Sequence, residues 1–378
     1  MDERVKEAVL KRIYENFDVR HKIEPELFRQ TWYKLNEAVD KGVGKEVKLG
    51  DPDYRFLHEL KTNNAVFAAF KAHREQNDLA ALLTDENGKQ RSFNDFRKAS
   101  EVIIGKYNVT WLQTEHAKAI RSARFAVRFR GYLDTIDLFP NGKWLPSRAA
   151  EPRESHMLYY YNIRSLLDSW WKTHYPGAEW GCKCDMENTD EPITHIGDRP
   201  VSPEEISTKT DKQVVSPGLD RNPAFTGSIF TDNHPYIKEG YPEAGEAVKQ
   251  FIEKELTKEE VKQSRTTVRQ WAKEKLIGKS MQMAGLDKPV SFTSTGIKEA
   301  LNQPHKFLLE KNEAIRHIES LLKKAKYVRT DPDVKGRNFK YHYFETEIAG
   351  KSSFIVIREN TDNKLTDFYS IVEKLKSD

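Results

Sequence analysis

The sequence has little cysteine: only Cys182 and Cys184 occur in 378 residues, and both stand in one Gly-Cys-Lys-Cys run. Two cysteines separated by one residue exclude a framework of several disulfides of the kind that stabilises small secreted domains. Long apolar runs are also missing, because no stretch approaches the roughly 20 residues of a membrane-spanning helix. The first residues, MDERVKEAVLKRIYENF, are charged throughout. We therefore expect neither a membrane partner nor a signal peptide.

A large excess of one charge is absent as well. The chain holds 62 Lys and Arg against 58 Asp and Glu, for a net charge of +4. This balance argues against a generic basic coat for nucleic acid, so any such binding has to come from a local patch. With 38% hydrophobic residues, a chain of this length suffices for two or three folded domains.

Residues 1 to about 135 are predicted to be helical. The segment Asn108–Asp134 contains no proline, and its apolar residues recur at three- and four-residue spacing, as on one face of a long helix. Tyr54–His73 has the same pattern. Pro, Trp, His and Cys then become dense from Phe139 to Pro192, where the tryptophans need burial. We interpret this part as irregular but tightly packed.

Residues 191 to about 240 are rich in Pro, Ser, Thr, Asp and Gly, which predicts an extended, partly mobile connector. A charged helix is expected roughly from Pro242 to Leu276. The last ninety residues resemble a separate unit, with a helix capped by Asn312 and then four strand-like runs. These runs are Lys326–Thr330, Phe339–Ile348, Ser352–Arg358 and Asp367–Val372.

The expected fold is therefore multidomain, with a mostly α N-terminal domain and a small α+β C-terminal domain built on an antiparallel sheet. The expected boundaries are residues 1–190, a connector with the charged helix at 191–290, and the C-terminal domain at 291–378.

A series of short motifs runs through the first half of the chain: Trp111-Leu-Gln-Thr-Glu115, Leu138-Phe-Pro, Leu145-Pro-Ser-Arg148, Pro152-Arg-Glu154, His156, Thr173-His-Tyr-Pro176 and Trp180-Gly-Cys-Lys-Cys184. In this order they resemble the phage Mu F-like minor head (head morphogenesis) proteins over about residues 20–195. The resemblance implies a low-copy protein of the phage head near the portal, with portal and capsid proteins as partners and the virion as its location.

Four residues of this half form a candidate metal site. Cys182 and Cys184, with His156 and His174 nearby in sequence, are ligand types that suit a tetrahedral structural zinc ion. The Cys-x-Cys step is tighter than the usual Cys-x2-Cys. One alternative is that both thiols pack as small hydrophobic groups while the histidines bind local backbone. Another is a polar network that clamps the irregular segment, made of Arg148, Glu151, Arg153 and His156.

Three segments of the C-terminal unit suggest a second family: Asn302–Lys306, the KYHYFETEI run around His342, and the SFIVIRE run that contains Arg358. They resemble the phage-encoded nuclease-like domains grouped with barnase, EndoU, colicin E5/D and RelE, over about Ser291–Lys376. The resemblance implies metal-independent cleavage of RNA without a cofactor, or a relative that has lost this activity. It also implies a polymorphic toxin that acts in the bacterial cytoplasm and has a cognate immunity protein.

Cleavage of RNA without metal needs a base, an acid and a cation for the phosphate charge. We expect His305 and His342 to be the acid and base, because histidine titrates near neutral pH. Arg358 is expected to hold phosphate through its planar fork. A three-residue loop at Ala349–Lys351 would set His342 opposite Arg358, whereas a two-residue turn would undo this register. Weaker candidates for substrate contact are Lys306, Thr293, Ser294 and Ser370.

Two other functions stay open at this stage. The chain would be a purely structural head protein if its C-terminal unit were a non-catalytic interaction module. It would be a toxin of another kind if this unit transferred ADP-ribose. Glu345 and Glu347 resemble a catalytic pair for that reaction, but no matching Arg-first strand accompanies them.

Overall fold

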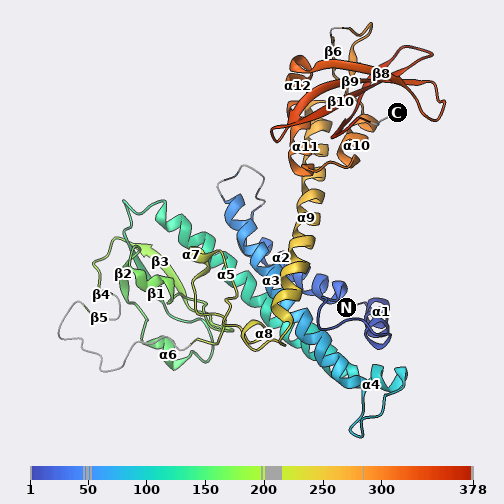
Figure 1. Cartoon of the computed structure of the whole chain (residues 1–378). Helices are drawn as coiled ribbons and strands as arrows, with labels where there is room; N and C mark the ends of the chain where they lie inside the picture. Colours follow the sequence, from blue (N-terminus) through green and yellow to red (C-terminus); the bar gives the residue numbers. More distant parts are fainter. Residues whose placement is uncertain are drawn as a thin grey trace. The chain divides into compact units, whose positions relative to one another are not determined.

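The computed structural model describes residues 2–375 except 46, 48–50, 52, 197–198, 201–214 and 284. The chain divides into two compact units, residues 1–253 and 254–378 (Figure 1). This division falls inside one helix, α9 (Ala244–Lys275). The domain boundaries expected at 190/191 and 290/291 stay a prediction. The charged helix expected at Pro242–Leu276 is confirmed as α9. No helix in the described ranges is both long and apolar enough to cross a membrane.

Helices dominate the start of the first unit, as predicted. They are α1 (Glu3–Tyr14), α2 (Pro25–Val43), α3 (Tyr54–Ala80), α4 (Phe93–Gly105), a π-helical turn (Lys106–Trp111) and α5 (Leu112–Leu133). The side chain of Glu24 caps α2 by accepting from two backbone N–H groups, and Gly44 ends that helix in the left-handed conformation. A Cβ atom on Gly42 would lie 2.4 Å from the Ile120 carbonyl oxygen, so glycine permits α2 and α5 to pack closely.

A three-stranded antiparallel sheet of order β2-β1-β3 follows the helices. Its strands are β1 (Asn141–Leu145), β2 (Ile163–Ser165) and β3 (Asp185–Thr189), with the short helix α6 (Glu154–Met157) between β1 and β2. A second, two-stranded sheet pairs β4 (His195–Ile196) with β5 (Arg199–Pro200). Trp144, Trp170 and Trp171 are buried, which confirms that this region is packed.

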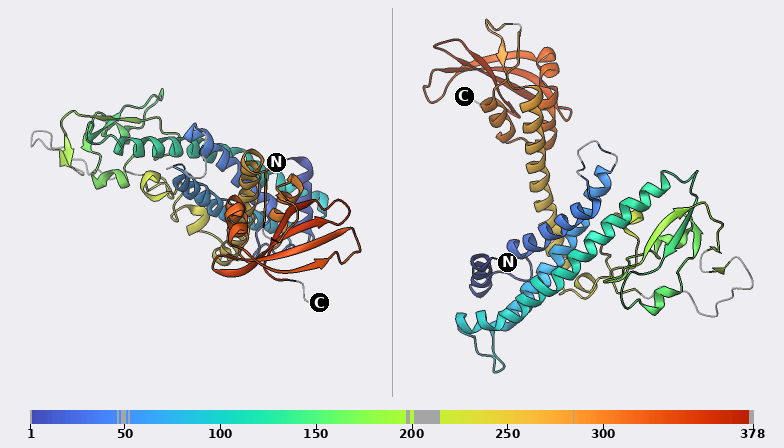
Figure 2. Two further views of the ribbon diagram at one scale, coloured as in Figure 1. Left: turned by 90° about the horizontal axis from the view of Figure 1, so that it is seen from above. Right: turned by 180° about the vertical axis from the view of Figure 1, so that it is seen from behind.

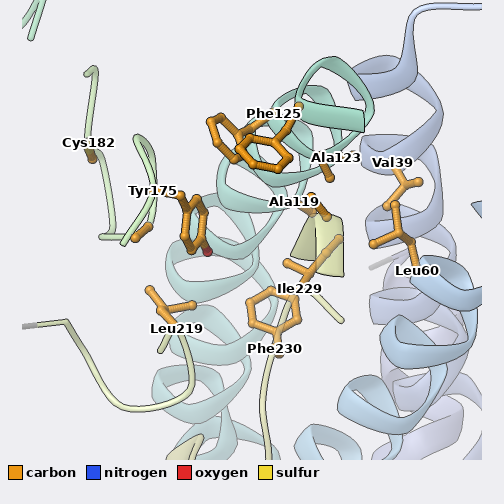
Figure 3. Close-up of a cluster of buried hydrophobic side chains, with 14 of the residues drawn as sticks. Val39, Leu60, Ala119, Ala123, Phe125, Tyr175, Cys182, Leu219, Ile229 and Phe230 are labelled. Carbon is orange, nitrogen blue, oxygen red and sulfur yellow. The ribbon is translucent and has the colours of Figure 1, made fainter. Parts of the chain in front are cut away.

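Much of the expected connector is part of the first unit's core. Residues 215–240 carry the short helices α7 (Pro223–Thr226) and α8 (Pro235–Lys238), and Ile229 and Phe230 are almost completely buried. The Phe230 ring stacks on Phe67 of α3 at 3.8 Å between centroids. Figure 3 shows Leu219, Ile229 and Phe230 beside the helices of this core. The prediction of an extended segment is therefore wrong for residues 215–240, while residues 201–214 lie outside the described part.

The second unit is an α+β domain around a six-stranded sheet of order β6-β7-β11-β10-β9-β8. The strands are β6 (Ser280–Met281), β7 (Val290–Ser291), β8 (Lys326–Pro332), β9 (Phe339–Ile348), β10 (Lys351–Asn360) and β11 (Thr366–Val372). The four expected strands are thus confirmed as β8 to β11. The sheet is mixed rather than purely antiparallel, because β7 pairs with β11 in parallel.

Helices cover one face of this sheet (Figure 2). They are α10 (Ser294–Asn302), α11 (Leu308–Ala314), a 3-10 turn (Ile315–His317) and α12 (Ile318–Lys324), together with the last turns of α9. Asn312 is buried within α11 rather than capping a helix, so that prediction is wrong. Phe307, five residues earlier, precedes the first residue of α11.

Candidate functional site

His156, Cys182 and Cys184 form a compact group in the first unit. His156 lies in α6, and the two cysteines lie in the turn that leads into β3. The Nδ1 atom of His156 is 3.4 Å from the Cys182 sulfur and 3.7 Å from the Cys184 sulfur. All three side chains are buried, and their ligand atoms lie within 4.8 Å of one another. This is the donor set of a soft or borderline metal ion.

The turn that carries the cysteines is held by contacts with two other elements. Gly181 adopts a positive φ of 66°, which lets the chain reverse after Trp180. The guanidinium of Arg121 on α5 donates to the Cys182 carbonyl, and the Lys183 carbonyl accepts from the Arg148 N–H at 3.2 Å. These contacts hold the backbone of the turn that carries both sulfurs.

The two thiols have unlike acidities in this group. The hydrogen bond with Cys184, aided by His156, lowers the pKa of Cys182, and the same contact together with burial raises the pKa of Cys184. The indole N–H of Trp144 and the hydroxyl of Tyr160 approach the Cys184 sulfur and counteract this rise. Neither donor has a well-formed hydrogen bond to another atom of the described residues, nor does the Nε2 atom of His156.

His174, the fourth ligand expected from the sequence, lies outside the group. Its ring stacks on Trp170 at 4.4 Å between centroids, and its Nδ1 atom is 2.9 Å from the Thr173 hydroxyl. The structure therefore brings together three of the four predicted ligands.

A cavity of about 260 Å³ adjoins the three ligand residues. Its wall includes the charged residues Glu151, Arg153 and Lys183. The Arg153 guanidinium donates to the Trp180 carbonyl at 2.8 Å, while the Arg148 guanidinium lies 3.9 Å from the Asp185 carboxylate. These arginines do tie the irregular segment together, as the alternative interpretation expected, but through backbone and Asp185 rather than through His156.

In the second unit, the predicted pairing of His342 with Arg358 is wrong. Ile348 pairs with Lys351, so the loop of the hairpin has two residues, Ala349 and Gly350. Both have positive φ. On the neighbouring strand, the residue paired with His342 is therefore Ile357, and the residue paired with Arg358 is Tyr341. Because successive side chains of a strand alternate between faces, His342 points to the helix-covered face and Arg358 to the opposite one.

The two histidines predicted to be catalytic are both engaged in local hydrogen bonds. His342 bonds the Glu359 carboxylate through Nε2 at 2.9 Å and the Thr330 hydroxyl through Nδ1 at 2.7 Å. His305 accepts from the Phe307 N–H at 3.0 Å and lies 3.2 Å from the Ser353 hydroxyl. Burial lowers the pKa of His305.

The two histidines contact β10 at different places. His305 contacts Ser353, whereas His342 is paired with Ile357. These positions lie four residues apart, or about 13 Å along a strand. The structure therefore does not bring the expected acid and base together.

The guanidinium of Arg358 binds a carboxylate of the neighbouring strand β11. Its Nε and Nη2 atoms donate to the two Asp367 oxygens at 3.0 and 2.8 Å, and the rings of Phe339 and Tyr369 flank the guanidinium. The planar fork expected to hold phosphate thus holds a carboxylate in this structure.

The weaker candidates do not converge on one place either. Thr293 caps α10 by accepting from the Gly296 N–H, and Ser294 is exposed at the start of that helix. Ser370 is buried in β11, and the Lys306 ammonium lies over the Phe307 ring.

Thr330 and Glu359 are the polar partners of His342 that sequence reasoning missed. A two-residue turn in the hairpin would have placed Glu359 diagonally beside His342 on one face. Thr330, His342 and Glu359 thus form a hydrogen-bonded chain on β8, β9 and β10.

Comparisons with known proteins identify relatives for two parts of the chain. Residues 259–369, within the second unit, match the family model of the Large polyvalent protein-associated domain 3. The Mu-like prophage FluMu F protein of Haemophilus influenzae is 24% identical over 138 residues, which are 36% of this chain and 30% of that protein. The putative capsid assembly protein F of Escherichia phage Mu is 28% identical over 97 residues, which are 26% of this chain and 22% of that protein.

These matches cover less than a third of the length of either relative. They confirm the similarity to Mu F-like proteins, whereas the nuclease resemblance of the C-terminal unit stays a prediction. No solved structure matches the chain.

Proposed function

We propose that the chain is a phage head morphogenesis protein, whose place of action is the virion head and whose partners are portal and capsid proteins. The observation that carries this proposal is the similarity to two phage F proteins, one of them named a putative capsid assembly protein. The order of the motifs from Trp111 to Cys184 supports the same family.

For the second unit we favour a non-catalytic interaction module over a ribonuclease. The three residues expected to cleave RNA lie at separate places, and each is held by local partners. An acid and a base must both reach the reacting phosphate, yet the two β10 residues that His305 and His342 lie against, Ser353 and Ile357, are about 13 Å apart along the strand. A ribonuclease toxin with an RNA substrate and an immunity protein is the competing prediction.

Expression of residues 254–378, which form their own core, separates these functions. A module without activity should leave bacterial growth and purified RNA unchanged in the presence of EDTA. Growth arrest together with RNA cleavage, lost in the His305→Ala and His342→Ala variants, would establish the nuclease instead.

The head function is tested by deleting the gene in the phage or prophage that encodes the chain. We expect fewer complete heads in electron micrographs and a lower titre of infectious particles, both restored by the full chain supplied in trans. Normal heads at a normal titre would overturn the proposal.

A further inference from the structure

We propose that His156, Cys182 and Cys184 bind one zinc ion with three protein ligands, and that the fourth coordination position opens into the adjoining cavity. This inference is independent of the proposed role in head assembly. It differs from the four-ligand structural site that the sequence predicts, because His174 takes no part.

The distances in the group match those of a zinc site. Zinc–sulfur and zinc–nitrogen bonds of about 2.3 and 2.05 Å at the tetrahedral angle separate a sulfur and a nitrogen ligand by about 3.6 Å. The two sulfurs lie 3.4 and 3.7 Å from the Nδ1 atom of His156. A zinc ion therefore needs little movement of these side chains, and His156 would bind it through Nδ1.

Buried donors beside the sulfur of Cys184 support a thiolate at that position. The indole N–H of Trp144 and the hydroxyl of Tyr160 are both buried and lack another good hydrogen bond within the described ranges. A buried donor without a partner lowers stability, so such atoms call for an explanation. A zinc-bound thiolate is a full acceptor for both donors, as in the outer shell of other metal sites.

The arrangement around the group leaves one position of the tetrahedron to the cavity. His174 is stacked on Trp170, and no other histidine, cysteine or carboxylate among the described residues joins the three ligands. The cavity of about 260 Å³ has room for a small ligand, and three protein ligands with one exchangeable position is the pattern of open zinc sites. Charged side chains of both signs, Glu151, Arg153 and Lys183, line the wall of this cavity.

The metal content of the full chain, purified without added zinc, tests the site. We expect one zinc ion per chain in the wild type and in His174→Ala, and a loss of most of the metal in Cys182→Ser and His156→Ala. His174→Ala is the matched control, since it removes a neighbouring imidazole that the structure excludes from the group. Zinc well below one per chain in folded wild-type protein would overturn the site, as would a Cys182–Cys184 disulfide in that protein.

Replacing zinc by cobalt in the wild-type chain tests the open coordination position. This experiment needs no substituted variant, so its result does not depend on whether a variant folds. Thiolate-to-cobalt charge transfer should appear in the near ultraviolet, and azide should shift the visible bands by entering the fourth position. Visible bands that do not respond to azide, together with zinc loss in His174→Ala, would overturn the open position in favour of a closed four-ligand site.

Discussion

A buried ion pair joins three helices of the first unit. The Lys71 ammonium of α3 is fully buried and lies 2.5 Å from the Glu115 carboxylate of α5. The second oxygen of Glu115 accepts from the Tyr236 hydroxyl of α8 at 3.1 Å. Replacing Lys71 by Met keeps most of the side chain's volume but leaves the carboxylate buried without its cation.

The size of the effect follows from this burial. Removing one partner of a buried pair destabilises a protein by about 3–5 kcal/mol, because the remaining charge is uncompensated. Tyr236→Phe removes one hydrogen bond to a charged group, for about 1.5–3 kcal/mol. The double replacement Lys71→Met and Glu115→Leu removes both charges, so it should cost less than Lys71→Met alone.

Unfolding in guanidinium chloride, followed by tryptophan fluorescence, measures these changes in the full chain. Six of the seven tryptophans lie in residues 1–253, so the signal reports mainly on the first unit. Lys34→Met is the matched control, since it removes an exposed lysine paired with Glu37 and should change stability by less than about 1 kcal/mol. A Lys71→Met variant no less stable than this control would show that the buried pair contributes little to the stability of the first unit.

Three further outcomes are expected. Burial raises the pKa of Glu75 from 4.5 to about 8, so the folded state keeps a proton that the unfolded state loses. The free energy of unfolding should therefore fall as the pH rises from about 4.5 to 8, and Glu75→Gln should abolish this fall in denaturant titrations. Gly296→Ala would place a Cβ atom 1.9 Å from the Phe368 carbonyl oxygen, which should lower the calorimetric melting temperature of the second unit. Limited proteolysis should spare residues 215–240, because Ile229 and Phe230 are buried; early cleavage there would contradict their packing.

The secondary structure of the second unit was largely predictable from the sequence. Alternating and β-branched residues predict β8 to β11 within a few residues, because each strand buries only one of its faces. The register was not predictable from the same pattern. The register depends on whether the hairpin loop has two or three residues. A difference of one residue in the loop changes which residue pairs with His342.

The remaining errors have related causes. Average composition predicts an extended segment at residues 215–240, yet a few apolar residues such as Ile229 and Phe230 suffice to anchor it. Three of the four residues predicted as zinc ligands lie together in the structure. Proximity in sequence does not fix the direction of a side chain, however, and the ring of His174 stacks on Trp170 instead.

Quantitative mass spectrometry of phage heads, purified from cells that produce the encoding phage, tests the proposed role in the head most directly. We expect peptides from residues 1–253 and from residues 254–378 in equal molar amounts, at low copy number relative to the major capsid protein. Heads that contain neither set of peptides, while the protein is abundant in the same cells, would contradict a role in the phage head.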